Sequence, residues 1–439
     1  MKKFIPIILF FVIAVFANAQ QLSKVYVLSE GGFNAGTSKL SLYDNTNNTF
    51  TQSIFSPGNI GLYPDGLVYY EGYLYLTEQG SFGSSGKIYK LDTLGTVLNS
   101  ATVGTNPYSL AITNGKIYIT NGPASNVTVL NLNDFSFVKN IQVGVYPQEI
   151  ISHNNKIFVA NNSVWGGASD STVSVIDPTL DSVIATITVR KDPSSLAISN
   201  DGYLLIGCPG DETKGRIYKV DPSSFQHVSE YSIQGYGFGK DISVDKYTNN
   251  IYFISYLNDI VKYDLTNGNT SVVLSSVYPN NYYYGYAYEY TTKKHFVLDA
   301  KSFTVEGTLS IIDSTYNLLS SYQTSIAPRR IVFKYNSGSL TADDKLIASN
   351  FSLEQNYPNP FNPSTKISWQ SPADSRQTLK IYDVLGNEIA TLVDEYREAG
   401  RYEVEFNAKG ITSGVYIYKL TITTDNNIFT SSRKMTLLK

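Results

Sequence analysis

The fold of this chain is decided by the stretch Ile117–Asn131, which reads I-Y-I-T-N-G-P-A-S-N-V-T-V-L-N. A short run of β-branched and aromatic residues, types that are enriched in strands, leads into a Gly-containing loop, and a second run of the same kind follows. The first run recurs along the chain with a mean spacing of about 45 residues. Its seven copies are Val25–Leu28, Tyr73–Leu76, Ile117–Thr120, Ile157–Ala160, Tyr203–Ile206, Ile251–Ile254 and His295–Leu298.

Each copy belongs to a larger repeating unit. The second strand of a unit tends to end in Asp, and a third segment usually opens with Pro and turns apolar, as in Pro107–Ile112 and Pro193–Ile198. A period of roughly 40–50 residues with about four short strands per unit is typical of a β-propeller blade. The sequence therefore predicts an all-β protein whose residues 20–336 form a seven-bladed β-propeller.

The recurring Asp has two interpretations. A carboxylate just past a strand can accept hydrogen bonds from backbone N–H groups of the following turn, which is the role we expect. A ring of metal ligands is the alternative.

The order of the strands predicts how the ring closes. The repeats begin at a second strand, Val25–Leu28, and they end with an innermost strand, Arg330–Lys334. We expect these two strands to pair in one blade, because this pairing would remove an open sheet edge.

Composition agrees with an all-β protein and excludes several functions. Aromatic residues make up 13% of the 439 residues, and the formal charge of −3 argues against a nucleic-acid binder that relies on a basic surface. The single cysteine, Cys208, cannot form an intrachain disulfide, and we expect a passive thiol. Three histidines leave little material for a His-built site. No metal site, catalytic residue or cofactor is assigned.

Residues 1–19 are predicted to be a signal peptide. Lys2 and Lys3 precede the apolar run Phe4–Ala17, and Ala17-Asn18-Ala19 matches a small-x-small cleavage site. An uncleaved membrane anchor is the alternative. We expect no transmembrane segment in the mature protein, because no later stretch is apolar enough to span a bilayer.

The repeats resemble the YVTN family of β-propellers. Ile117–Gly122 matches the motif that names this family, and Ser171–Asp177 matches the strand that follows it. The resemblance is closest in the third and fourth units, whereas the first, sixth and seventh units share mainly the spacing.

The composition changes after a predicted linker at residues 337–350. In residues 351–439, the segment Leu353–Pro363 carries three prolines and cannot be a helix or a central strand. Six or seven strand-like runs follow within about 90 residues, which predicts a small Ig-like β-sandwich.

This tail resembles the type A C-terminal sorting domain of the type IX secretion system. The resemblance rests on the box Asn356–Pro363, on Ile381–Gly386, on Gly414–Leu420 and on the terminal Lys434–Lys439. The motif residues are Asn356, Pro358, Pro360, Phe361, Pro363, Gly414, Tyr416, Lys434 and Lys439.

The resemblance implies a Bacteroidota-type bacterium and the type IX machinery as partner. The protein would pass through Sec to the periplasm and then cross the outer membrane, after which the tail is often cleaved and the cargo released or attached to surface lipopolysaccharide. An ordinary Ig-like adhesive module is the alternative.

Candidate ligand-binding residues come from the predicted channel mouth. The positions two residues past each Pro-like residue align as Gly66, Ser109, Glu149, Ser195, Asp241, Tyr286 and Arg330. Glu149, Asp241 and Arg330 could orient a polar ligand through charge-assisted hydrogen bonds, or they could pair with each other and with channel water.

Longer loops on the same face carry aromatic residues. These residues are Phe33, Phe82, Trp165 and Phe303. Trp165 and Phe303 are the candidates to stack on sugar rings, and the alternative is that they cap blade edges.

We therefore predict an exported cell-surface or secreted propeller that binds an unknown extracellular ligand or protein. One alternative is a lactonase-like hydrolase or lyase that uses Glu149 and Asp241, with or without a divalent metal. That alternative rests on fold-level analogy alone. A structural surface-layer component is a third possibility.

Overall fold

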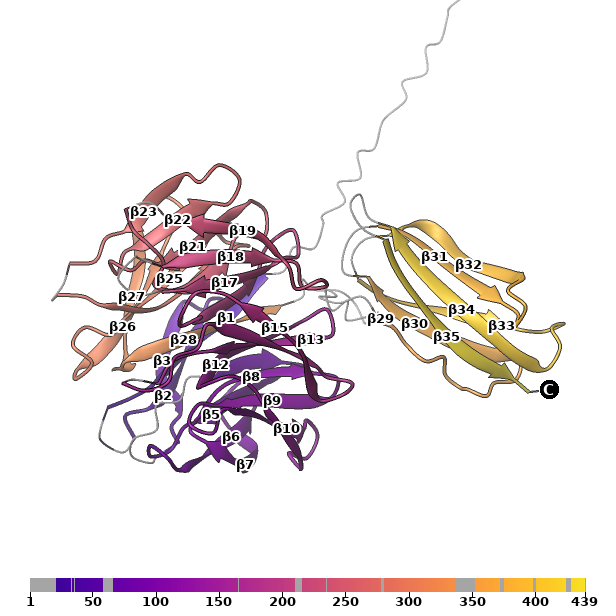
Figure 1. Ribbon diagram of the computed structural model, residues 1–439, viewed down its shortest axis with the longest axis horizontal. Coiled ribbons are helices and arrows are strands. Elements are labelled where there is room, and N and C mark those ends of the chain that lie inside the picture. The colour runs from indigo at the N-terminus through magenta and orange to yellow at the C-terminus, as the bar shows by residue number, and fades with distance from the viewer. Residues whose placement is uncertain are drawn as a thin grey trace, which may run out of the picture.

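The computed structural model describes residues 21–32, 34, 36–57, 66–164, 166–209, 215–233, 235–277, 280–336, 352–371, 375–397, 400–423 and 428–438. The predicted signal peptide and linker lie outside the described residues, as do Trp165 and Lys439. Every regular element of the described part is a β-strand, and none of its segments forms a helix long and apolar enough to cross a membrane (Figure 1). The predicted all-β class is confirmed.

The described strands between residues 21 and 336 form seven four-stranded antiparallel sheets, as predicted. Each sheet has an innermost, a second, a third and an outermost strand. The innermost strands are β4 (Leu67–Tyr70), β8 (Pro107–Thr113), β12 (Pro147–His153), β16 (Ser195–Ile198), β20 (Lys240–Val244), β24 (Tyr283–Glu289) and β28 (Pro328–Asn336). The second strands are β5 (Tyr73–Glu78), β9 (Lys116–Asn121), β13 (Lys156–Asn161), β17 (Leu204–Cys208), β21 (Asn250–Ile254), β25 (Lys294–Asp299) and β1 (Gln21–Ser29).

The third and outermost strands complete each sheet in the same order. The third strands are β6 (Ser85–Leu91), β10 (Asn126–Asn131), β14 (Thr172–Asp177), β18 (Arg216–Val220), β22 (Ile260–Asp264), β26 (Glu306–Ile312) and β2 (Lys39–Asp44). The outermost strands are β7 (Val97–Thr105), β11 (Phe137–Gln142), β15 (Ser182–Thr188), β19 (His227–Ser232), β23 (Thr270–Leu274), β27 (Leu318–Ile326) and β3 (Thr49–Phe55).

The hydrophobic core of the propeller lies between neighbouring sheets. The second strands are buried on both faces, so they are nearly continuous apolar runs, whereas outermost strands such as β27 alternate between exposed and half-buried residues. Tyr118 and Phe158 are the aromatic residues of two consecutive second strands, and both are fully buried. The recurring run seen in the sequence is therefore the buried strand that each blade packs against its neighbours.

The ring closes as predicted. Strand β28 pairs antiparallel with β1, with Arg330 opposite Leu28 and Lys334 opposite Lys24. The innermost strands also contact one another in the order β4, β8, β12, β16, β20, β24 and β28, and β28 contacts β4. The last strand of the repeats thus joins the first three strands in one sheet.

The recurring Asp residues have the predicted structural role. Asp92 Oδ1 accepts hydrogen bonds from the backbone N–H groups of Thr96 (2.9 Å) and Leu94 (2.8 Å), and these bonds lower the pKa of the Asp92 carboxyl. Asp313 Oδ1 accepts the backbone N–H of Asn317 in the equivalent turn, and the pKa of Asp313 is lowered for the same reason. Each carboxylate organises the turn that leads into an outermost strand.

The described part of residues 352–438 forms two sheets around one core. Strands β29 (Ser352–Leu353), β30 (Ser364–Ser371) and β33 (Gly400–Asn407) make the first sheet. Strands β32 (Glu388–Arg397), β31 (Ser375–Tyr382), β34 (Gly414–Thr423) and β35 (Ile428–Leu437) make the second sheet in that order (Figure 1). Trp369 from the first sheet and Tyr418 from the second are fully buried in the shared core. The predicted β-sandwich is confirmed.

The Asn356–Pro363 box is built into this sandwich. The backbone N–H of Asn356 donates to Tyr418 Oη (2.8 Å), and its side-chain Nδ2 donates to the carbonyl oxygen of Pro358 (3.0 Å). Phe361 is buried, and its backbone exchanges hydrogen bonds with the strand β35 region at Thr436 and Leu438, each 3.0 Å long. The box therefore holds the last strand of the chain in place.

Three other predicted motif residues lie on the strands that the box secures. Gly414 opens β34 opposite Leu437, and Tyr416 is buried and donates its hydroxyl to the carbonyl oxygen of Thr412 (2.8 Å). Lys434 lies on β35, where its carbonyl oxygen accepts a hydrogen bond from Gln355. These residues share one structural unit with the box.

Candidate functional site

The seven innermost strands begin at one face of the ring, which we call the channel mouth. Of the seven residues that the sequence alignment placed at the channel mouth, six occupy equivalent positions in their innermost strands. The exception is in β24, where a register shift between Tyr283 and Gly285 places Gly285 opposite Leu298, just as Arg330 lies opposite Leu28. A Cβ atom on Gly285 would lie 2.3 Å from the carbonyl oxygen of Arg329, so only glycine fits there.

The prediction of Tyr286 as a channel-mouth residue was therefore wrong. Its side chain is 6% exposed and lies inside the blade, where its hydroxyl is 2.8 Å from His295 Nδ1. The irregular pairing in β24 displaces the alignment by one residue, and a one-residue displacement along a strand moves a side chain to the opposite face.

Glu149 and Arg330 lie together and pair with each other, which is one of the two arrangements that the sequence left open. Arg330 Nη2 donates to Glu149 Oε1, and the two side chains are 20% and 12% exposed, respectively. Their strands, β28 and β12, are not neighbours in the ring, because β4 and β8 lie between them on one side. The ion pair consequently links opposite parts of the channel mouth.

Asp241 pairs with a different arginine from the one predicted. Arg329 Nη1 donates to both carboxylate oxygens of Asp241, at 2.9 and 2.8 Å, and the Arg329 side chain is buried. Arg329 also donates to the carbonyl oxygen of Tyr284 (3.3 Å), and Asp241 Oδ2 accepts the backbone N–H of Tyr286 (3.1 Å). Strands β20, β24 and β28 are joined through this network.

The hydrogen bond that the Asp241 carboxylate accepts from the backbone of the next blade has an uncharged equivalent one blade earlier in the ring. Ser195, at the equivalent position of β16, accepts the backbone N–H of Ile242 through its hydroxyl (3.0 Å). This position thus links adjacent innermost strands in two blades. Sequence reasoning missed Arg329, although the Arg329-Arg330 doublet at the start of the last repeat was visible.

An aromatic cluster lies next to these ion pairs. We call Tyr282, Tyr284 and Phe303 the aromatic platform. The Phe303 ring centroid is 4.8 Å from that of Tyr284 and 5.3 Å from that of Tyr282, and 39% of Phe303 is exposed. Tyr284 donates its hydroxyl to the carboxylate of Glu30 at 2.9 and 3.0 Å. Phe303 therefore both packs against blade residues and presents part of its ring to solvent.

The other predicted aromatic residues contribute less to this site. Phe82 is 82% exposed on its own loop. Phe33 and Trp165 lie outside the described residues.

A pocket of about 460 Å³ lies beside the aromatic platform. It is lined by Gly239, Lys240, Ile254, Ser255, Tyr256, Leu257, Asn258, Ser276 and Tyr282. Tyr282 belongs to both the platform and the pocket. The Lys240 ammonium lies over the platform, 4.1 Å from the ring centroid of Tyr284 and 5.4 Å from that of Tyr282.

The base of this pocket is held by hydrogen bonds between two blades. Asn258 Nδ2 donates to the carbonyl oxygen of Tyr283, and Asn258 Oδ1 accepts the backbone N–H of the same residue, both at 2.8 Å. The turn after β21 is thereby attached to the start of β24. Sequence reasoning missed Lys240 and this pocket, because the pocket arises between loops of two blades.

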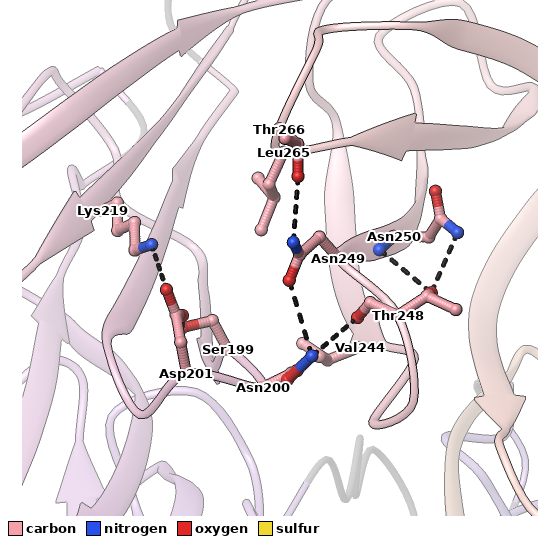
Figure 2. Close-up of a pocket in the computed structure, with 10 residues that line it drawn as sticks. All are labelled: Ser199, Asn200, Asp201, Lys219, Val244, Thr248, Asn249, Asn250, Leu265 and Thr266. Atoms are coloured by element: carbon pink, nitrogen blue, oxygen red, sulfur yellow. Dashed lines mark hydrogen bonds and ion pairs between the residues drawn. The ribbon is translucent and has the colours of Figure 1, made fainter. Parts of the chain in front are cut away.

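A second pocket, of about 190 Å³, lies at the other end of the innermost strands (Figure 2). Its polar side chains bond to one another: Asn249 Nδ2 donates to Thr266 Oγ1 (2.9 Å), and Asn200 Nδ2 donates to the carbonyl oxygen of Thr248 (3.1 Å). Lys219 forms an ion pair with Asp201 at its rim. None of the predicted site residues lines this pocket, and its contacts join two blades.

The side chains of Cys208 and His295 are buried inside the blades. Burial raises the pKa of the Cys208 thiol to about 12, so this group stays protonated at neutral pH, in agreement with the expected passive thiol. Burial lowers the pKa of His295 to about 4. Across the part of the chain that the structure describes, no group of three or more His, Cys, Asp or Glu side chains is arranged to hold a metal ion.

The closed ring of seven sheets and the separate sandwich define a β-propeller protein with a C-terminal β-sandwich. The chain belongs to the family described as "Domain of unknown function (DUF5074)", which matches residues 24–330. Residues 355–435 match the family described as "Secretion system C-terminal sorting domain". The propeller expected from the YVTN resemblance is confirmed as a fold, and the family that matches is DUF5074.

Solved structures support the propeller fold. A quinonprotein alcohol dehydrogenase-like protein from Bacteroides thetaiotaomicron is 16% identical, with a TM-score of 0.56 over 72% of this chain and 79% of its own. A periplasmic gluconolactonase from Pseudomonas aeruginosa is 13% identical, with a TM-score of 0.53 over 71% of this chain and 99% of its own. A candidate 6-phosphogluconolactonase from Bacteroides fragilis is 14% identical, with a TM-score of 0.53 over 71% of this chain and 98% of its own. No curated protein matches the chain.

The sorting-domain match has a direct consequence for location. It shows that the protein is carried across the outer membrane by a type IX secretion system, to the cell surface or the medium. The predicted export is confirmed.

Proposed function

We propose that the exported propeller is a binding protein that takes a polar extracellular ligand in the pocket beside the aromatic platform. The observation that carries this proposal is the combination, at one edge of the channel mouth, of a 460 Å³ pocket, partly exposed aromatic rings and a lysine. Ligand pockets are commonly concave, with aromatic walls and a few polar groups that orient the ligand. Saccharides suit such a surface because their apolar ring faces stack on aromatic side chains while their hydroxyls form hydrogen bonds.

In this proposal the predicted charged residues support the site. Glu149, Asp241 and Arg330 keep the mouth in one conformation, because each carboxylate accepts hydrogen bonds from an arginine of β28. Phe303 acts as part of the platform, and Trp165 stays a predicted contact outside the described residues. A preorganised surface binds more tightly because less conformational entropy is lost on binding.

The two carboxylates suit this supporting role better than catalysis. A hydrolase that used Glu149 or Asp241 as general base would have to withdraw that carboxylate from its arginine. The solved lactonases share only the fold with this chain, and fold alone does not carry an activity.

The proposal is tested by presenting an array of glycans and peptides to the mature full chain, followed by titration calorimetry with the best ligand. Tyr282→Ala and Phe303→Ala should each weaken binding about tenfold, or about 1.4 kcal/mol, as expected for the loss of a stacking surface. Phe137→Ala is the matched control, because Phe137 is an exposed aromatic on β11, in a different blade. Unchanged affinity in both platform variants would place the ligand elsewhere.

A further inference from the structure

The motif Gly414–Leu420 forms the first part of β34, a central strand of the second sheet that lies between β31 and β35 (Figure 1). Alternate side chains of a strand point to opposite faces of its sheet. Tyr416, Tyr418 and Leu420 point into the core of the sandwich and are buried. These three residues account for folding, so the residues between them need a separate explanation.

Two of the residues that point away from the core are apolar. Val415 and Ile417 are each 38% exposed, and the half-buried Tyr382 of β31 lies directly opposite Ile417. The solvent face of an antiparallel sheet usually carries polar side chains, as the first sheet does with Lys366 and Ser368 of β30. An apolar strip on an exposed sheet face indicates a surface that another molecule covers.

Lysines border this apolar strip. Lys434 of β35 lies directly opposite Ile417, and Lys419 of β34 lies directly opposite Lys380 of β31. Lys380 forms an ion pair with Glu388 (2.8 Å), whereas no carboxylate in the described part of the sandwich pairs with Lys419 or Lys434. Like charges that lie directly opposite each other destabilise a sheet. Lys419 therefore does not stabilise the fold at its position, and a role in binding explains it better.

We propose that this surface docks the sandwich onto an outer-membrane protein of the type IX secretion system. We call it the export face, and it consists of Tyr382, Val415, Ile417, Lys419 and Lys434. All five residues lie within the match to the sorting-domain family at residues 355–435. A receptor contacts exposed side chains, so it reads the outward residues of the motif, while the inward residues build the fold.

The charge of the export face specifies the partner surface. Lys419 and Lys434 flank the apolar strip and have no described carboxylate to neutralise them. Complementary surfaces place acidic groups opposite basic ones around an apolar centre. The partner surface is thus acidic with an apolar centre. This proposal does not depend on the ligand pocket of the propeller.

The first test reverses both lysine charges in the full chain, produced in a bacterium that has a type IX secretion system. Lys419→Glu combined with Lys434→Glu should reduce the share of protein at the surface and in the medium about tenfold, because like charges would then meet across the interface. Lys419→Glu alone should not destabilise the sandwich, since it places a carboxylate opposite Lys380. Cell fractionation measures export, and thermal melting of the purified variants measures the sandwich transition.

A second variant removes the apolar strip and leaves the charges in place. Val415→Thr combined with Ile417→Thr keeps β-branched side chains, so the sandwich should fold while export falls. The control is Lys409→Glu, because Lys409 is an exposed lysine on the loop after β33, outside the export face. This control should be exported like the unmodified protein.

Photo-crosslinking identifies the molecule that covers the export face. A photoreactive amino acid in place of Ile417 should form an adduct with an outer-membrane component of the exporter, identified by mass spectrometry. The same group in place of Ser368, on the outer face of the first sheet, should not form it. Absence of this adduct from position 417, or adducts only with a second copy of the chain or with its own propeller, would overturn the proposal. Normal export of the charge-reversal and threonine variants would overturn it as well, as would equal impairment by Lys409→Glu.

Discussion

Two consecutive arginines at the start of β28 reach different blades. Arg329 pairs with Asp241 of β20, and Arg330 pairs with Glu149 of β12. Successive side chains of a strand point to opposite sides, so adjacent residues cannot share one partner across the channel. The expectation of one charged ring thus becomes two separate ion pairs, one of them buried between blades and one across the mouth.

The pair between Glu149 and Arg330 should contribute to stability. Glu149→Ala or Arg330→Ala alone would leave a mostly buried charge without its partner, and we expect each to lower the free energy of unfolding by about 2–3 kcal/mol. The double variant Glu149→Leu/Arg330→Met should be less destabilised than the sum of the single variants, because both charges are gone. Urea unfolding of the four proteins measures this coupling, and strictly additive effects would contradict it.

A second prediction concerns His295, whose side chain is 1% exposed and bonded to Tyr286. Its pKa is about 4 in the folded protein and about 6.5 when unfolded, so the unfolded state binds the proton first as pH falls. Stability should therefore be lost from about pH 6.5 downward until about pH 4. Between pH 7 and pH 5 this loss amounts to about 2 kcal/mol.

The variant His295→Gln isolates this effect. It keeps a hydrogen-bonding side chain but does not titrate, so its free energy of unfolding should change about 2 kcal/mol less over the same interval, whatever its starting stability. Urea titrations at pH 7 and pH 5 compare the two proteins. Identical pH dependence would show that His295 is not the group responsible.

At the scale of the element, β28 decides whether the ring is closed. It pairs with β1 along most of its length and also contacts β24 and β4. Without it, the blade that begins at β1 would lack its innermost strand, and β1 would expose an unpaired edge.

Two chain lengths test this dependence. A chain of residues 21–336 contains β28 and should unfold cooperatively, whereas a chain of residues 21–327 lacks it. The shorter chain should aggregate or lose several kcal/mol of stability, as expected when the burial of one strand is removed at about 25 cal/mol per Å². Scanning calorimetry and light scattering check this, and equal midpoints would mean that β28 is dispensable for closure.

At the scale of the whole molecule, export and binding belong to different parts of the chain. The sorting-domain family covers residues 355–435, and the propeller has its own cores between its sheets. Removal of residues 351–439 should therefore leave a folded propeller that stays in the periplasm. Its melting temperature should match that of the propeller transition in the full chain.

Cell fractionation and calorimetry test this division. Normal surface or medium levels of the truncated protein would contradict the assignment of the tail as export signal. As a control, Phe361→Ala removes a buried side chain from the sandwich core and should impair export without altering the propeller transition.

The repeat architecture of this protein could be predicted from the amino-acid sequence alone. The aromatic run typified by Ile117–Thr120 recurs because each second strand is buried on both faces, and burial of that kind leaves a periodic apolar signal. The closing pair of β1 and β28 followed from the order of the strands, and the Asp turns followed from local hydrogen bonding. These features depend on residues that are close in the chain or on a fixed repeat length, so they can be predicted from the amino-acid sequence.

Which residues meet at the channel mouth depends on how the blades are arranged in three dimensions. The register shift that puts Gly285 where Tyr286 was expected lies between two strands of one blade. The choice of Arg329 as partner of Asp241 and the pocket beside Lys240 each involve two or more blades. Side chains that converge there are separated by tens to hundreds of residues, and their contacts depend on strand register and on which side of a strand each one points. A shift of one residue leaves the repeat period unchanged but reverses the direction of a side chain, so the pattern that reveals the blades carries no information about the partners at their centre.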